Sequence, residues 1–209
     1  MRFILFFLVL AVNVFSTESP TYLNLRDYLT KNKVRVTEGS ISGPEETWLV
    51  QFLKKHPNFT SIAEIGFNVG YSAEIFLKHC PKAKVVSFDI GKHEYLKDGK
   101  KYLDMTYPDR LSLVFGDSKK TVNKYANQNK GEKFNFIFID GSHEYLTAYL
   151  DIKNMKKFAR KNTYVMIDDL QLLKVRDAYN RCCKEGILTN CKVYKMGWRS
   201  WAIGKYHFR

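Results

Sequence analysis

Five short apolar runs alternate with longer amphipathic segments between residues 61 and 185, and this alternation limits the folds open to the chain. A short apolar run is typical of a strand buried on both faces, whereas the longer segments have helical spacing. Strands separated by helices form a parallel sheet with helices on both sides. The expected strands are residues 61–65, 84–88, 111–115, 134–139 and 163–167.

Helices are expected between these strands and before the first of them. Right-handed crossovers then give a doubly wound arrangement. In the stretch SGPEETWLVQFLKK, Pro44 falls in the first helical turn, where proline is favoured. The expected helices are residues 21–30, 42–55, 72–79, 95–105, 119–127, 145–159 and 170–185.

The end of the chain has a different pattern. The runs CKVYKMG and SWAIGKYHF are joined by Gly197, Trp198 and Arg199, which predicts an antiparallel hairpin. The fold class is therefore α/β, a Rossmann-like, doubly wound sheet of seven strands that is mostly parallel and ends in a C-terminal antiparallel hairpin. The residues Trp198, Arg199 and Trp201 either flank a substrate or pack the hairpin on the sheet edge, and the sequence leaves both open.

The first 19 residues have the pattern of a secretory signal peptide. Arg2 precedes an apolar stretch, residues 3–15, and small or polar residues follow it, with cleavage expected after Ser16 or Ser19. Residues 20–209 then form a single domain. The predicted location is secreted or the ER lumen, without stable membrane insertion after cleavage. The alternative is an uncleaved membrane anchor through residues 3–15.

Two further features fit an oxidising compartment. Asn58-Phe59-Thr60 is a glycosylation sequon, which predicts a glycoprotein. The four cysteines lack the spacing of a zinc site and suit one or two disulfides. A bridge from Cys191 to Cys182 or Cys183 is expected, with Cys80 as a buried residue at a helix end.

The formal net charge is +13, but the lysines are scattered and no nucleic-acid motif is present. Solvated helix faces are the favoured interpretation, and an acidic substrate or an anionic surface stays open as a partner. The expected partner is a small-molecule acceptor, with no specific nucleic acid, and an oligomer is left open.

Every predicted parallel strand has an acidic residue at or beside its carboxyl end, where open sheets of this kind bind ligands. Single acids at such places often cap helices, but five along one edge also repel one another, which favours a functional edge. These acids are Glu64, Asp89, Asp117, Asp140 and the pair Asp168-Asp169.

The loop EIGFNVGYS after the first strand departs from the dinucleotide pattern G-x-G-x-x-G. Gly66 matches, but Asn68 and Tyr71 stand where the second and third glycines belong, which weakens a nicotinamide or flavin interpretation. Gly66, Gly70 and Ser72 still form a loop suited to a nucleoside ligand, and Asp89 lies where a carboxylate can bind ribose hydroxyls.

Taken in order, EIGFNVGYS, VVSFDI, FGDSKKT, FIFIDGSHEYLTAYLDI and YVMIDDL resemble the class I S-adenosylmethionine-dependent O-methyltransferases. The likeness is to the family that includes the cephalosporin-hydroxylase-like proteins and the macrolide-sugar O-methyltransferases, and more distantly to catechol-type enzymes. It covers about residues 40–205. This resemblance implies a transferase that uses S-adenosylmethionine and, in the metal-dependent members, Mg²⁺ or another divalent cation.

The resemblance also implies a role for individual residues. His143 matches the position of the catalytic base, three residues after the first metal ligand, and Asp140 is that ligand. The implied metal ligands are Asp140, Asp168 and Asp169, where the catechol type has Asp-Asn at the last two positions. The implied donor-binding residues are Glu64, Gly66, Asn68, Gly70, Ser72, Asp89, Asp117 and Ser118.

The expected reaction is O-methylation of a small hydroxylated acceptor, such as a sugar or a catechol-like group. Carboxylates supply hard oxygen ligands, and a histidine is suited to take a proton near neutral pH. Alternatives stay open at several levels. His143 and Asp169 can instead cap the helices that follow them, and the enzyme can be metal-free. The whole chain can be a secreted binding protein that keeps the fold without turnover, or, with less support, a nicotinamide-dependent oxidoreductase.

Overall fold

One mixed sheet of seven strands forms the centre of the computed structural model, which describes residues 22–39, 41 and 43–208. Neighbouring strands follow the order β3-β2-β1-β4-β5-β7-β6, and only β7 runs against the others. The strands are β1 (Ser61–Ile65), β2 (Lys84–Asp89), β3 (Leu111–Phe115), β4 (Phe136–Ile139), β5 (Tyr164–Ile167), β6 (Leu188–Met196) and β7 (Arg199–Tyr206). This confirms the predicted fold class.

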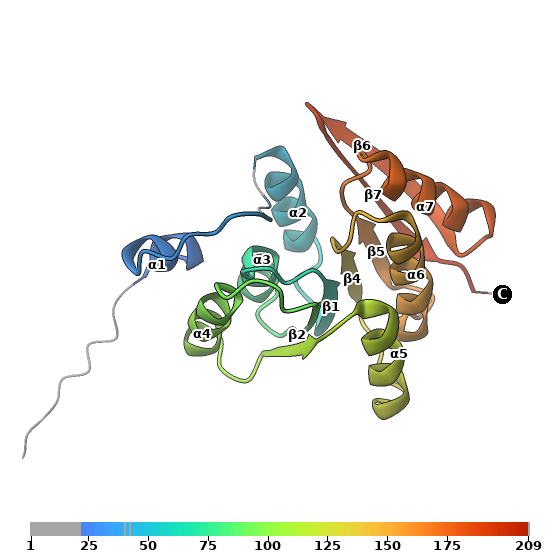
Figure 1. Cartoon of the computed structure of the whole chain (residues 1–209). Coiled ribbons are helices and arrows are strands. Elements are labelled where there is room, and N and C mark those ends of the chain that lie inside the picture. Colours follow the sequence, from blue (N-terminus) through green and yellow to red (C-terminus); the bar gives the residue numbers. More distant parts are fainter. Residues whose placement is uncertain (1–21, 40, 42, 209) are drawn as a thin grey trace, which may run out of the picture.

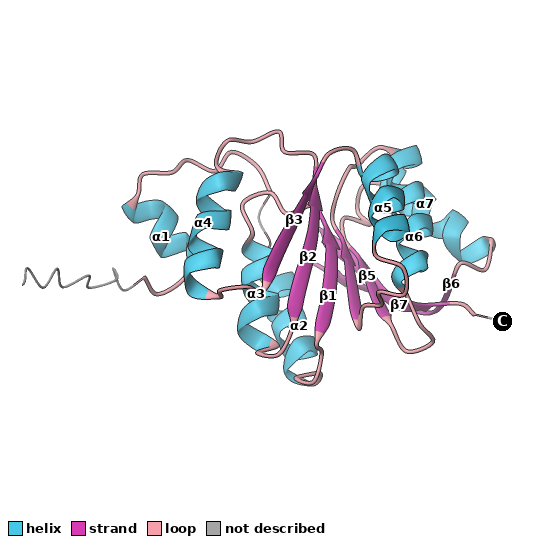
Figure 2. Ribbon diagram, turned by 90° about the horizontal axis from the view of Figure 1, so that it is seen from below, coloured by secondary structure: helices cyan, strands magenta, loops and turns pink. Residues whose placement is uncertain are grey.

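Helices cover both faces of the sheet, as Figures 1 and 2 show. One face carries α1 (Leu25–Lys31), α2 (Pro44–Lys54), α3 (Tyr71–His79) and α4 (Leu96–Thr106), and the other carries α5 (Ser118–Gln128), α6 (Tyr145–Met155) and α7 (Leu173–Lys184). Successive side chains of β4 point alternately toward the two helix layers. Phe136 and Phe138 pack under the first group of helices, and Ile137 and Ile139 under the second.

The point where the chain reverses direction lies between β1 and β4. From β1 the chain moves outward to β2 and β3, and it then returns to add β4 on the other side of β1. The loops after β1 and β4 therefore leave the sheet toward opposite layers, which opens a crevice at the carboxyl ends of the strands.

Element boundaries differ from the sequence prediction mainly at the two ends of the chain. The first helix begins at Leu25, because Asn24 caps it by accepting from the backbone N–H of Asp27. The predicted leader, residues 1–19, lies outside the described residues. Within the part of the chain that the structure describes, no helix is both long and apolar enough to cross a bilayer.

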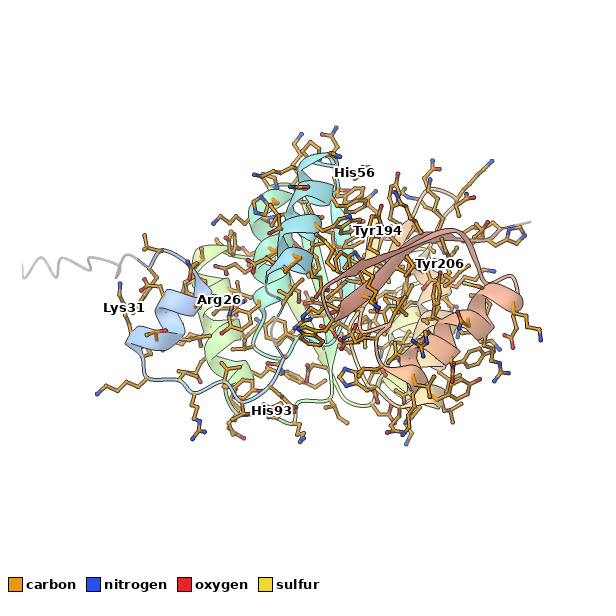
Figure 3. The ribbon with its side chains drawn as sticks, turned by 90° about the horizontal axis from the view of Figure 1, so that it is seen from above. Arg26, Lys31, His56, His93, Tyr194 and Tyr206 are labelled. Carbon is orange, nitrogen blue, oxygen red and sulfur yellow. The ribbon has the colours of Figure 1, made fainter. Side chains whose placement is uncertain are left out.

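The C-terminal hairpin has a tighter turn than the sequence suggests. Met196 pairs with Arg199, so only Gly197 and Trp198 form the turn. Trp201 is fully buried and packs on Trp48 of α2, with ring centroids 5.8 Å apart. Tyr194, also on the hairpin, packs on Trp48 as well, with ring centroids 4.9 Å apart, and faces α2 in Figure 3. Packing on the sheet edge is therefore the role of Trp201.

Candidate active site

A cavity of about 850 Å³ lies at the carboxyl ends of the strands. Its wall is built by the loops after β1, β2, β3, β4 and β5, together with the tip of the hairpin and a strap that contributes Glu38, Gly39 and Ile41. Among the predicted site residues, these line it: Gly66, Asn68, Ser72, Asp89, Asp117, Ser118, Asp140, His143, Asp168 and Asp169. The cavity is large enough for a nucleoside ligand and a small second molecule together.

Glu64 and Gly70 are not among the lining residues. Glu64 is fully buried on β1 and accepts hydrogen bonds from the hydroxyls of Ser72, at 2.6 Å, and Ser87. Burial raises the pKa of Glu64 to about 7, although the two hydroxyls oppose the shift. The carboxyl group thus ties the start of α3 to the sheet beneath the cavity floor.

The two glycines of the first loop are needed for backbone reasons. Gly66 has φ +99°, and a Cβ there would lie 1.8 Å from the carbonyl oxygen of Asp140. Gly70 has φ +96°, and a Cβ there would meet the ring of Phe67 at 2.7 Å. The close approach at Gly66 brings the loops after β1 and β4 together, which sets the position of Asp140.

Asp89 is held at the end of β2 by two backbone amides. Its Oδ2 accepts from the N–H of Asn68 at 2.8 Å, and its Oδ1 accepts from the N–H of Gly91 at 2.7 Å. At the end of β3, Asp117 caps α5 by accepting from the N–H of Lys119 at 3.0 Å. Helix capping therefore accounts for one interaction of Asp117, while Asp89 presents a fixed carboxylate to the cavity.

The acids after β4 and β5 meet a histidine at one end of the cavity. One side-chain ligand atom from each of Asp140, His143 and Asp169 lies within 4.8 Å of the other two. Nε2 of His143 is 2.8 Å from Oδ2 of Asp169, and Gln171 donates to the other oxygen of Asp169. The hydrogen bond that His143 donates to Asp169 raises the pKa of His143, although partial burial opposes the shift.

Neither helix-capping alternative describes these residues. The N-cap of α6 is Glu144 and that of α7 is Leu172, and neither helix receives a side-chain cap. Asp169 instead adopts φ +58° in a loop that runs on to Leu172, so α7 begins three residues later than predicted. The side chains of His143 and Asp169 therefore contact each other at the cavity wall and do not cap a helix.

Asp168 was predicted to bind a metal together with Asp140 and Asp169, but its side chain faces a different group of residues. Its side chain is only 3% exposed and faces Glu45, at the start of α2, and Arg199, at the start of β7. Arg199 donates to Oε2 of Glu45 at 2.9 Å and lies 4.0 Å from Oδ2 of Asp168. The structure thus places His143, not Asp168, in the tight group with Asp140 and Asp169.

Glu45 and Asp168 form a buried carboxyl pair beside Arg199. As an ionised carboxylate, Oε1 of Glu45 has no hydrogen-bond partner among the described residues, but as a carboxylic acid it donates to Asp168. Burial first, and then the charge of Asp168, raises the pKa of Glu45 to about 10. Burial also raises the pKa of Asp168 to about 6, against the bond from Glu45. The raised pKa favours the neutral form of Glu45.

Repulsion between neighbouring carboxylates also acts on Asp140. Burial, Asp168 and Asp169 together raise the pKa of Asp140 well above its ordinary value, and Arg199 opposes them. The carboxyl groups of Asp140, Asp168 and Asp169 thus converge at the ends of β4 and β5, and repulsion among them raises the pKa values of Asp140 and Asp168. Hard oxygen donors under mutual repulsion fit a divalent cation.

The mouth of the cavity combines an aromatic residue with charged groups. Trp198 is 70% exposed, and the guanidinium of Arg199 lies 4.8 Å from the centre of its ring. On the strap, Glu38 contacts His93, which is labelled in Figure 3 and stacks on Tyr95. Trp198 and Arg199 therefore line the cavity, while Trp201 belongs to the core.

Comparisons with known proteins show which family the chain belongs to. Residues 63–170, just over half of the chain, match a family model described as a methyltransferase domain. A comparison with curated proteins gives no match.

Solved structures share the fold at low sequence identity. An O-methyltransferase from Bacillus cereus in complex with SAH has 16% identity and a TM-score of 0.71, covering 90% of this chain and 93% of that one. The SAH-bound methyltransferase PaMTH1 of Podospora anserina has 15% identity and a TM-score of 0.70, covering 88% of each chain. CalS11, a TDP-rhamnose 3'-O-methyltransferase of calicheamicin biosynthesis, has 20% identity and a TM-score of 0.60, covering 77% and 76%. The resemblance seen in the motifs is confirmed, and the chain belongs to the methyltransferase-domain family.

Proposed function

We propose that this protein is an S-adenosylmethionine-dependent O-methyltransferase that uses a divalent cation and acts on a small hydroxylated acceptor. The observation that carries the proposal is the group Asp140, His143 and Asp169, which shares one cavity with the loops after β1, β2 and β3. The first of these features suits activation of a hydroxyl group, and the second suits a nucleoside donor.

The donor fits the half of the cavity formed by the first three strands. Asp89 presents a carboxylate that two backbone amides hold in place, as recognition of ribose hydroxyls requires. Two of the structural neighbours were solved with SAH, the demethylated form of this donor. S-adenosylmethionine, when bound, supplies the methyl group as an electrophile on a sulfonium.

The cation fits the acidic end. Asp140 and Asp169 would hold it with their oxygen atoms, and Asp168 lies beside them. A bound Mg²⁺ lowers the pKa of a coordinated hydroxyl group. His143, half-exposed at the cavity wall, is the group that takes the proton from the acceptor, and Asp169 orients its ring through the 2.8 Å contact.

The acceptor enters beside Trp198 and Arg199. An exposed indole over a guanidinium offers a flat apolar surface with polar groups around it, which suits a sugar or an aromatic ring. CalS11, the neighbour that acts on a TDP-sugar, shares the fold over 77% of this chain. The acceptor class therefore remains a small molecule with at least one hydroxyl group.

Calorimetric titration with S-adenosylmethionine, with and without Mg²⁺, tests both halves of the proposal. The protein is expected to bind the donor, and Asp89→Ala is expected to weaken that binding at least tenfold, because one good charged hydrogen bond contributes about 1.5 to 3 kcal/mol. Asp140→Asn is expected to remove Mg²⁺ binding and keep donor binding. Asp177→Asn, an exposed carboxylate on α7, is the matched control. Absence of donor binding by the unmodified protein contradicts the proposal.

The compartment is a separate proposal. Asn58 of the sequon is exposed between α2 and β1, so an oligosaccharide there would point into solvent. We propose that the chain enters the secretory pathway. Expression of the full chain in animal cells is expected to give a product that an N-glycosidase shifts to lower mass, and Asn58→Gln is expected to abolish the shift. An unshifted wild-type chain retained in the cytosol contradicts this proposal.

A further inference from the structure

Two thiols face each other on the hairpin side of the molecule, away from the residues that line the cavity. Sγ of Cys183, near the end of α7, lies 3.9 Å from Sγ of Cys191 on β6. Both are half-buried and therefore within reach of solvent, and neither is bonded to the other. The adjacent Cys182 is fully buried, and its thiol contacts the carbonyl oxygen of Tyr149 at 4.0 Å. Of the two partners open to Cys191 in the sequence, only Cys183 is adjacent.

The sheet makes room for this contact. The pairing of β6 with β7 shifts register between Thr189 and Lys192, so Cys191 lies in a bulge. Opposite it stands Gly204, where a Cβ would lie 2.7 Å from Sγ of Cys191. A larger residue at Gly204 would displace the thiol. The bulge and the glycine together direct Cys191 toward the end of α7.

The pair is also chemically asymmetric. Cys183 and Cys191 share a thiol–thiol hydrogen bond, and the hydroxyl of Tyr179 interacts with both sulfur atoms. The hydrogen bond with Cys191 lowers the pKa of Cys183 to about 6, although burial opposes the shift, and this favours the thiolate form of Cys183. A thiolate in contact with solvent is the nucleophile in thiol–disulfide exchange. The partner thiol needed to complete the exchange is already in place.

We propose that Cys183 and Cys191 form a reversible disulfide by exchange with a small disulfide such as oxidised glutathione. The thiolate of Cys183 attacks one sulfur of glutathione disulfide and releases one glutathione thiolate. Cys191 then loses its proton and attacks the Cys183 sulfur of the mixed disulfide, which releases the second glutathione. The two protein thiols are oxidised by two electrons, and one glutathione disulfide is reduced to two thiols.

The bond would fasten α7 to the hairpin. The same hairpin carries Arg199, which pairs with Glu45 at the cavity, and β7 pairs with β5, which ends at Asp168. Only seven residues separate the two cysteines, so the closed loop is short. A loop of this length is expected to raise the unfolding temperature of a domain this size by roughly 5 to 10 °C.

The test uses the full chain equilibrated in glutathione buffers from fully reduced to fully oxidised. Alkylation of free thiols followed by tryptic mass spectrometry is expected to show two thiols lost under oxidising buffer, with CCK linked to EGILTNCK, the two peptides cut at Lys184. The unfolding temperature is expected to rise, and dithiothreitol is expected to reverse both changes.

Variants decide which cysteine is used. Cys182→Ala and Cys80→Ala are expected to keep the linked peptides and the thermal shift, and Cys183→Ala is expected to lose both. Four free thiols in the fully oxidising buffer would overturn the proposal, as would a linked peptide that survives in Cys183→Ala. The readouts require no methyl transfer, so the result is independent of the proposed function.

Discussion

Nε2 of His143 lies 2.8 Å from Oδ2 of Asp169, and this contact links the ends of β4 and β5 across one side of the cavity. The two residues are 26 positions apart, yet parallel neighbouring strands deliver both to the same edge of the sheet. The contact fixes the orientation of the imidazole ring, and the charge of the carboxylate stabilises its protonated form.

The pKa of His143 in the metal-free protein is therefore expected to lie above its ordinary value of about 6.5. Since only the neutral ring accepts a proton, methyl transfer is expected to rise with pH as His143 loses its proton. Asp169→Asn removes the stabilising charge and is expected to lower the pKa of His143 toward 6.5, as followed by NMR titration of the ring protons. His56 and His79 are internal controls, because burial lowers their pKa values. An unchanged titration of His143 in Asp169→Asn contradicts the assignment.

The second prediction concerns the buried carboxyl pair of Glu45 and Asp168. A neutral Glu45 donates to Asp168 and accepts from Arg199, and a glutamine amide can do the same. Glu45→Gln is therefore expected to change the free energy of unfolding at pH 7 by less than about 1 kcal/mol. Glu45→Leu leaves both partners without it and is expected to cost about 2 to 4 kcal/mol.

Urea denaturation of the two variants at pH 7 measures this difference. If Glu45 were instead ionised and paired with Arg199 as a buried ion pair, removing its charge would cost about 3 to 5 kcal/mol in both variants. Equal losses for Glu45→Gln and Glu45→Leu would thus contradict a neutral Glu45.

The third prediction tests the close approach of the loops after β1 and β4. Gly66→Ala places a methyl group 1.8 Å from the carbonyl oxygen of Asp140 and strains a backbone at φ +99°. Gly186→Ala is the matched control, because Gly186 also has positive φ, +67°, but a Cβ there meets nothing within 4 Å. The control is expected to cost about 1 to 2 kcal/mol, and Gly66→Ala at least 2 kcal/mol more. Similar urea midpoints for the two variants would show that the loops do not touch.

The sheet could be predicted from sequence because its signal is local. β1 and β3 begin and end where the apolar runs do, at Ser61–Ile65 and Leu111–Phe115. β1 is buried on both faces, while β3, the edge strand, is exposed at Ser112 and Phe115. A polar turn follows each apolar run, so the ends of the strands could be read from the sequence. The acids at the strand ends could be placed at one edge for the same reason.

The arrangement within the site could not be predicted in this way. Glu45 comes from a helix that precedes the sheet, and Arg199 from β7, the last strand in the chain, so no spacing in the sequence relates either to Asp168. The start of α7 was predicted too early, because Leu170 is apolar and fits the helical period. In the structure its N–H donates to the carbonyl of Ser200, which holds the loop open. Tertiary hydrogen bonds of this kind leave no local pattern.

The last prediction concerns Asp151, a carboxyl group on α6 that is 1% exposed and lies behind the loop at Gly141. Neither of its oxygens makes a hydrogen bond of normal length among the described residues, and Ser118 is the polar neighbour that favours the ionised form. Burial raises its pKa from 3.8 to about 7. Above pH 4 the unfolded chain releases the proton while the folded chain keeps it, so stability falls as pH rises from about 4 to 7.

Replacing Asp151 by Asn removes this penalty without changing the shape of the side chain. The variant is expected to be more stable than the unmodified protein at pH 8 by about 2 to 4 kcal/mol, and to match it within about 1 kcal/mol at pH 4.5. Urea denaturation at the two pH values measures the difference, and taking variant against unmodified protein cancels the titration of Asp140, Glu64 and Asp168. Asp177→Asn, exposed on the neighbouring α7, is the matched surface control. A stability gain for Asp151→Asn that is equal at both pH values would mean that the carboxyl group does not carry a raised pKa in the folded protein.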